Sequence, residues 1–282
     1  MDEGIRARLL CAHDRERAIA CLAEDPDANL ALIDYVDRLG RALAPGEILP
    51  TVQGAFRGEE LLGVVLLRPC VAISSGIPQS ALDFLMPQLL RVPGGLVKSD
   101  REVVDRVWPR LESAGRRASI DRIEIAYRLK PADMLPADPD LPGVARPARM
   151  EDLDELVHAA RASLWEEDRP DPAEGDLPGF RRWVASRVSR ARIVTDAGRI
   201  VFVAYADVRR SEGWLIQGVY TWPECRRRGF ARRGMDSVIR EAFASGAAHV
   251  QLAVVEGNER ASALYRELGF ESFGELRTIL FS

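Results

Sequence analysis

The sequence has few of the residues that mark disulfide-rich or metal-binding proteins. It contains only 4 cysteines and 3 histidines in 282 residues, with no C-x-x-C pair and no histidine near a cysteine at ligand spacing. We therefore expect reduced thiols and no bound metal, with Cys11 and Cys21 facing the core. Aromatic residues make up only 7% of the chain, which predicts a largely aliphatic core.

Long apolar runs are also missing. The longest, residues 61–67, is interrupted by Gly63 and falls far short of the roughly 20 residues that a membrane helix needs. The chain opens with the acidic Asp2 and Glu3 rather than with the basic and then apolar stretch of a secretory signal. We expect a cytoplasmic protein that does not act at membranes.

A basic excess is absent as well. The formal net charge is -4; residues 1–140 carry 18 basic and 22 acidic side chains, and the remainder carries 21 of each. Neither half has the positive charge of a nucleic-acid-binding domain, so a nucleic-acid partner is not expected. Only Lys98 and Lys130 are lysines, and the preference for arginine is typical of a GC-rich, bacterial genome.

The length favours two domains, at about 150 residues each. Residues 131–147 contain five prolines, which excludes a helix interior or a central strand and predicts a linker. We therefore place one domain at 1–135 and a second at 143–282. A second polar stretch, residues 166–178, predicts a mobile loop within the second domain.

Apolar periodicity predicts a mixed α/β fold in both halves. In the first half it predicts strands at 7–11, 51–56, 61–67, 71–73 and 122–129, and helices at 14–24, 28–39, 80–90 and 100–114. In the second half it predicts strands at 144–149, 192–195, 200–208, 214–221, 249–255, around Phe270 and at 276–281, and helices at 150–164, 180–189, 230–245 and 258–268. The similar order in the two halves suggests a duplicated fold with diverged sequence.

One segment carries a charge conflict. Five of the eight residues 226–233 are arginines, and no acid occurs from 225 to 235, at the predicted start of a helix. A helix N-terminus already attracts anions, so cations gather there at a cost unless an anion lies among them. A bound diphosphate resolves the conflict, with Gly229 allowing a tight bend and Ala231 keeping the surface small. The alternative is a solvated helix start in an arginine-rich protein.

Three segments in this region resemble the GNAT superfamily of N-acetyltransferases. Arg226-x-x-Gly229-x-Ala231 is similar to the acetyl-CoA signature Q/R-x-x-G-x-G/A. Residues 258–270 resemble the second motif, N-x-x-A-x-x-L-Y-x-x-x-G-F, and residues 218–224 resemble the strand that leads into the phosphate loop. The resemblance covers 144–282. The first domain has no such signature and resembles only a degenerate copy, so we do not expect it to bind acetyl-CoA.

The resemblance implies a set of coenzyme contacts. The strand at 214–221 should part from the strand at 249–255, with pantetheine between them bonded to main-chain groups of Val219 and Thr221. Arg226 matches the first position of the signature. The diphosphate should lie on the main-chain N–H groups of the residues that follow: Arg227, Arg228, Gly229, Phe230, Ala231 and Arg232.

The second motif predicts its own helix. Asn258 is a good N-cap, Ala261, Leu264, Tyr265 and Leu268 form one apolar face, and Gly269 ends the helix. The family places the tyrosine hydroxyl near the sulfur of the coenzyme, where Tyr265 would protonate the departing thiolate. Asn258 is a further candidate for coenzyme contact. The alternative for Tyr265 is a core tyrosine.

The implied reaction is direct acetyl transfer to a small-molecule or peptide amine in a ternary complex, by a monomer or homodimer. The oxyanion would be held by a main-chain N–H near Val219. The general base stays open: Asp207, Glu224, Glu256, His158 and His249 are all candidates, and each also fits a structural role. Because no base is evident, a non-catalytic acyl-CoA sensor is the alternative function.

Overall fold

The computed structural model describes residues 4–43, 47–167, 169–171 and 173–282, and its two halves repeat one order of elements. The first half runs through β1 (Ile5–Leu9), α1 (Arg15–Leu22), α2 (Pro26–Asp37), β2 (Thr51–Arg57), β3 (Glu60–Arg68), β4 (Ala72–Ile73), α3 (Gln79–Leu89), β5 (Gly95–Asp100), α4 (Arg101–Ser113) and β6 (Ala118–Leu129). The second runs through β7 (Arg146–Pro147), α5 (Leu153–Glu166), α6 (Leu177–Ala185), β8 (Ala191–Asp196), β9 (Arg199–Arg209), β10 (Trp214–Thr221), α7 (Phe230–Ala244), β11 (Val250–Val255), α8 (Glu259–Glu267) and β12 (Glu271–Phe281). The suggested duplication is therefore confirmed.

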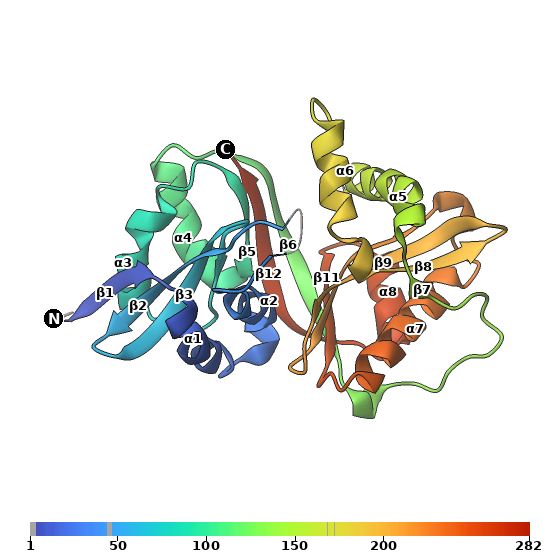
Figure 1. Ribbon diagram of the computed structural model, residues 1–282, viewed down its shortest axis with the longest axis horizontal. Coiled ribbons are helices and arrows are strands. Elements are labelled where there is room, and N and C mark those ends of the chain that lie inside the picture. The colour runs from blue at the N-terminus through green and yellow to red at the C-terminus, as the bar shows by residue number, and fades with distance from the viewer. Residues whose placement is uncertain (1–3, 44–46, 168, 172) are drawn as a thin grey trace.

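The final strand of each half is built into the other half. One sheet has the order β1-β2-β3-β4, and the other has the order β5-β12-β6-β11-β10-β9-β8-β7. Thus β6, from the first half, pairs with β11 and β12, while β12, from the second half, pairs with β5 and β6. Figure 1 shows β6 and β12 side by side between the two halves. The linker at 131–147 separates the halves in sequence, but the sheet joins them.

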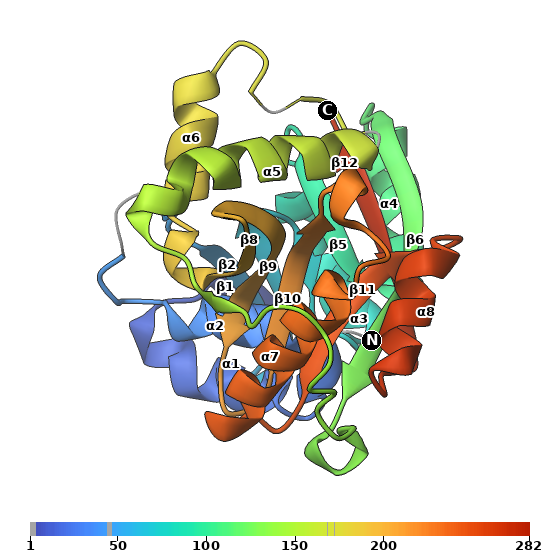
Figure 2. The same ribbon diagram turned by 90° about the vertical axis from the view of Figure 1, so that its right-hand side faces the viewer.

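Helices cover both faces of each half. In the second half, α7 and α8 pack with β9, β10, β11 and β6 around one apolar cluster, whereas α5 and α6 pack on the opposite face of β8–β10. Figure 2 shows α5 above these strands and α7 below them. In the first half, α3 and α4 cover one face and α1 and α2 the other. Within the described ranges, no helix is long and apolar enough to cross a membrane.

Most of the expected elements are present, and two expectations about the strands fail. Strand β5 was not expected, because Gly94, Gly95 and Lys98 interrupt its apolar pattern. The two expected C-terminal strands form one, β12, whose polar first residues are held by pairing with β6. The expectation for Cys11 is also wrong: its side chain is exposed, at the start of a short 3-10 turn.

Candidate functional site

Strands β10 and β11 are parallel and part from each other along their length. They pair only through Trp214 with Val250 and Leu215 with Gln251, although β10 continues to Thr221 and β11 to Val255. Beyond these pairs, β10 is held by β9 and β11 by β6. The expected separation of the two strands is therefore present, and it opens toward their carboxyl ends.

A bulge lies on the β10 side of this opening. Gln217 pairs with Tyr205 and Tyr220 pairs with Val203, so Gly218 and Val219 together oppose the single residue Ala204. Gly218 has φ +55°, a conformation that favours glycine. A bulge leaves main-chain groups outside the regular ladder, so it presents backbone N–H at the opening. Val219 itself is half-buried.

The turn after β10 ends in an uncapped helix start. Gly229, at φ +86°, is the N-cap of α7, and neither a side-chain cap nor an acidic residue occurs in the first turn. The first helical bond runs from the Arg233 amide to the Gly229 carbonyl, at 3.0 Å. The amides of Phe230, Ala231 and Arg232 therefore have no helical acceptor and can bind an anion.

Several arginines of residues 226–233 form ion pairs that the local sequence does not predict. Acids distant in the sequence pair with three of them: Glu166 with Arg226 at 2.6 Å, Asp196 with Arg228 at 3.0 Å, and Glu267 with Arg232 at 3.7 Å. Arg227 is exposed at φ +58° and makes no ion pair with any described residue. The charge conflict is thus largely relieved by tertiary contacts. The case for an anion rests on the helix-start amides and on Arg227.

Three of the predicted coenzyme contacts also have structural roles. The Thr221 carbonyl accepts a hydrogen bond from Nε of Arg226 at 2.8 Å, which fixes the turn. Phe230 is buried in the core that α7 shares with the sheet, with the guanidinium of Arg228 4.9 Å from its ring centroid. Ala231 is half-buried against the same core.

The linker packs along α7 and reaches its start. A Cβ atom at Gly229 would lie 2.9 Å from Leu141 and 3.1 Å from Pro142. Nε of Arg233 donates to the Gly143 carbonyl at 3.1 Å. Between linker, α7 and α8 lies a cavity of about 20 Å³, lined by Leu141, Arg232 and Leu268 among others, which is room for one water.

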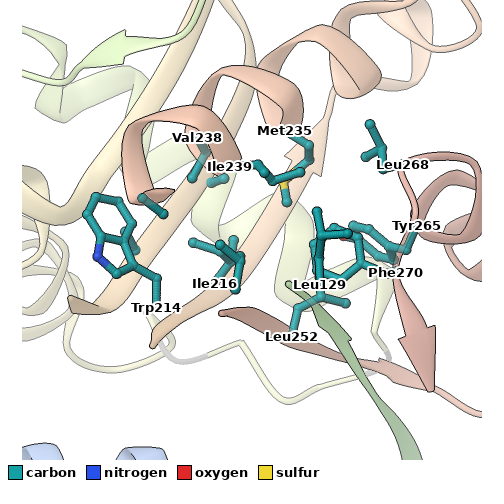
Figure 3. Close-up of a cluster of buried hydrophobic side chains, with 14 of the residues drawn as sticks. Leu129, Trp214, Ile216, Met235, Val238, Ile239, Leu252, Tyr265, Leu268 and Phe270 are labelled. Carbon is teal, nitrogen blue, oxygen red and sulfur yellow. The ribbon is translucent and has the colours of Figure 1, made fainter. Parts of the chain in front are cut away.

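Tyr265 lies on the buried face of α8. Its ring centroid is 5.7 Å from that of Phe270 and 6.4 Å from that of Tyr127, and Figure 3 shows it beside Leu129 and Leu252. Burial raises the pKa of its hydroxyl well above the ordinary value. The raised pKa keeps the hydroxyl protonated, and no described residue forms a hydrogen bond with it. Asn258 caps α8 by accepting from the Ala261 amide at 3.1 Å.

The open candidates for a general base are mostly engaged elsewhere. Asp207 forms an ion pair with Arg187 at 2.5 Å. His249 is buried at the start of β11, where the two strands are still paired, and burial lowers its pKa. His158 and Glu224 are exposed, and Glu256 lies in an open polar hollow with Arg101, Arg277 and their acidic partners. None of them stands out as the base.

Sequence reasoning missed two parts of the site. The bulge at Gly218 had a weak signal, a glycine inside a strand pattern. The pairing of Glu166 with Arg226 had none, because 60 residues separate the partners. Glu166 also accepts a hydrogen bond from the Tyr220 hydroxyl at 3.2 Å.

Comparison with known proteins gives a family match in the second half and a fold match over both halves. Residues 152–270 match the model of the acetyltransferase (GNAT) family. A Drosophila protein of solved structure is 18% identical, with a TM-score of 0.74 over 98% of this chain and 99% of its own. A GCN5-related N-acetyltransferase from Sphaerobacter thermophilus is also 18% identical, with a TM-score of 0.61 over 98% of this chain and 94% of its own.

A third solved structure is a tandem GNAT protein from the clavulanic acid biosynthesis pathway, 15% identical. Its TM-score is 0.53, over 98% of this chain and 97% of its own. At such identities, the solved structures show a shared fold that extends through the first half. Among curated proteins, no match to the sequence was found.

Proposed function

We propose that the protein is an acetyl-CoA-dependent N-acetyltransferase that acts by direct transfer to an amine, since residues 152–270 match the acetyltransferase (GNAT) family. The observation that carries this proposal is the parting of β10 and β11 beside the bulge at Gly218. A gap of this kind lets pantetheine lie between two strands and bond to exposed main-chain groups. The uncapped amides of α7 then receive the diphosphate of the same molecule.

In the proposed reaction, the nitrogen of a neutral amine attacks the thioester carbonyl. The carbon–nitrogen bond forms, the carbon–sulfur bond breaks, the amine loses a proton and the thiolate gains one. The N–H of Val219 in the bulge would stabilise the oxyanion, and the Tyr265 hydroxyl would protonate the thiolate. Holding both substrates together supplies much of the rate, and no covalent enzyme intermediate is required.

The first half would then shape the acceptor side of the site. Its strand β6 pairs with β11, and its helix α2 reaches the second half through an ion pair of Asp37 with Arg210 at 3.0 Å and a contact of Asp27 with Nδ1 of His249 at 3.2 Å. These contacts place first-half residues beside the sheet that would carry the thioester. The acceptor itself would be a small-molecule or peptide amine.

The test is acetyl-CoA binding by calorimetry, followed by coenzyme release with a panel of amines. Ala231→Glu puts a carboxylate in the first turn of α7, where the helix tolerates it but a diphosphate does not. We expect it to weaken acetyl-CoA binding at least about a hundredfold, since it adds a like charge within a phosphate site. The matched control Ala244→Glu adds the same charge to the exposed last turn and should bind like the wild type.

Circular dichroism of each variant ensures that only folded protein is compared. A wild type that does not bind acetyl-CoA, or an Ala231→Glu variant that binds as the wild type does, contradicts the proposal. Binding without coenzyme release on any amine identifies the acyl-CoA sensor instead.

A further inference from the structure

The wide end of the gap is bridged from the α5 side by two consecutive glutamates. Glu166, the last residue of α5, contacts Nη2 of Arg226 through both carboxylate oxygens, at 2.7 and 2.6 Å. It also accepts from the hydroxyl of Tyr220, near the end of β10, and the ring of Tyr220 lies 5.7 Å from the guanidinium of Arg226. Burial and Glu166 raise the pKa of Tyr220 to about 12, so this hydroxyl stays a donor.

The next residue is attached to the other side of the gap. Glu167 accepts from Nη2 of Arg122 on β6 at 3.0 Å. Arg122 in turn contacts Glu124 at 3.3 Å, and Glu124 is buried opposite Val255, the last residue of β11. Lys98 on β5 contacts the second oxygen of Glu124 at 2.5 Å. Burial raises the pKa of Glu124, but the effects of Lys98, Thr278 and Arg122 together outweigh burial and hold this pKa at about 2.

Together these contacts link β10 to the β6–β11 side at the end of the strands where β10 and β11 are no longer paired. Glu166 holds the β10 edge and Glu167 holds the β6–β11 edge, so adjacent backbone positions fix the separation of the two edges. The four anchoring side chains are between 15% and 39% exposed, and hydrogen bonds between charged groups are roughly twice as strong as those between neutral groups. We call Glu166 and Glu167 the brace.

The brace lies on the opposite face of the sheet from the elements that would hold the coenzyme. The helix-start amides and Tyr265 belong to α7 and α8, which cover one face of the sheet, whereas α5 covers the other. A thioester that enters from the α7–α8 face and meets the bulge directs its acyl group through the gap toward α5. There the acyl group approaches the brace.

We propose that the brace sets the length of the acyl group that the site accepts, by preventing the gap from widening on the α5 side. This inference rests on the proposed function and deepens it. An acetyl group ends within the gap. A butyryl group is two methylenes longer and must displace the brace, which breaks ion pairs on both edges. Glu166 and Glu167 are positioning residues in this account, since they act through Arg226, Tyr220 and Arg122.

The experiment compares calorimetric dissociation constants for acetyl-CoA and butyryl-CoA. We expect the wild type to bind butyryl-CoA at least about tenfold more weakly, which is within the range seen when one or two methylenes do not fit. In the double variant Glu166→Gln/Glu167→Gln, the ratio of the two constants should fall at least about fivefold. A purely structural role would weaken both ligands equally.

Asp171→Asn is the matched control. Asp171 lies in the same loop and pairs with Arg161 at 2.5 Å, away from the gap, so its loss should leave the ratio unchanged. Arg122→Lys keeps the charge but replaces the guanidinium, which contacts Glu124 and Glu167 through separate nitrogens, with a single ammonium. The weakened brace should lower the ratio in the same direction. Thermal unfolding checks that each variant is folded, and the single glutamine variants replace the double one if it is not.

A wild type that binds both thioesters equally, or a folded double variant with an unchanged ratio, overturns the inference. In either case acetyl-CoA still binds and the proposed function stands. If the wild type binds neither thioester, it is the proposed function that fails.

Discussion

The two halves repeat one order of elements but differ in the space between their fourth and fifth strands. In the second half, β10 and β11 separate after two residue pairs. In the first half, β4 and β5 meet at Val71 and Val97, and beyond that point the Ile73 amide donates to the hydroxyl of Ser99 at 2.7 Å. That hydroxyl replaces the missing ladder bond, so the first-half gap is closed by a side chain.

The segments that lead into the next helices, α3 and α7, also differ between the two halves. A Cβ atom at Gly63 on β3 would lie 2.5 Å from Ile77, so the segment before α3 packs tightly into its own sheet. Helix α3 follows Pro78, and no arginine occurs from 72 to 79, whereas α7 follows an arginine-rich turn and an uncapped Gly229. One fold thus has an opening between two parallel strands in one copy and a filled core at the same place in the other.

The largest expected effect tests whether the halves can be separated at all. The fragment 143–282 lacks β5 and β6, so β11 loses one of its two neighbours and β12 loses both of its partners. Tyr127 and Leu129 also leave the core around α7 and α8. We expect no cooperative thermal unfolding of this fragment by circular dichroism. The fragment 118–282, which restores β6, should unfold cooperatively.

Equal unfolding of the two fragments would show that the shared strands are dispensable. The halves would then be independent domains, as the linker at 131–147 alone suggests.

A smaller effect is expected from removing the hydroxyl of Tyr265, which has no counterpart at Trp108 in the first half. Helix α4 of the first half buries Trp108 against Phe281, whereas α8 buries Tyr265 with an uncommitted hydroxyl. Tyr265→Phe should lower kcat about a hundredfold, as expected for loss of a general acid, and change acetyl-CoA affinity less than about threefold. Because the raised pKa keeps the hydroxyl protonated, its deprotonation should cause no loss of wild-type activity at any pH up to about 9.

Steady-state kinetics and calorimetry on wild type and Tyr265→Phe make the comparison. Equal kcat values would reduce Tyr265 to a packing residue, like Trp108 in the other half.

The local parts of this contrast could be predicted from the sequence. Strand β10 and helix α7 follow from apolar periodicity, and the Asn258 cap and the Gly229 bend follow from residue type. These features depend on neighbours within a few residues. The sequence motifs therefore predict the Gly229 bend and the Asn258 cap correctly, and the role of Tyr265 stays a prediction.

The parts that depend on distant residues could not be predicted. The exchange of β6 and β12 between the halves is a matter of strand pairing, and nothing in either strand specifies its partner. The acids that neutralise Arg226, Arg228 and Arg232 come from three different elements, so a local charge count overstated the need for an anion. Closure of the first-half gap by Ser99 likewise required strand β5, whose pattern was too polar to recognise.

The smallest effect concerns that closure. Ser99→Ala leaves the buried Ile73 amide without its acceptor, and an unsatisfied buried donor costs about 1–3 kcal/mol of unfolding free energy. Ser245→Ala, which removes an exposed hydroxyl at the end of α7, should change stability by less than about 0.5 kcal/mol. Both variants should bind one acetyl-CoA per chain, as the wild type should, because Ile77 and its neighbours still fill the first-half gap. Denaturant unfolding and calorimetric stoichiometry measure the two quantities. If Ser99→Ala leaves the free energy of unfolding unchanged, this hydrogen bond does not close the first-half gap. If a second equivalent of acetyl-CoA binds, the two halves differ less than their strand pairing indicates.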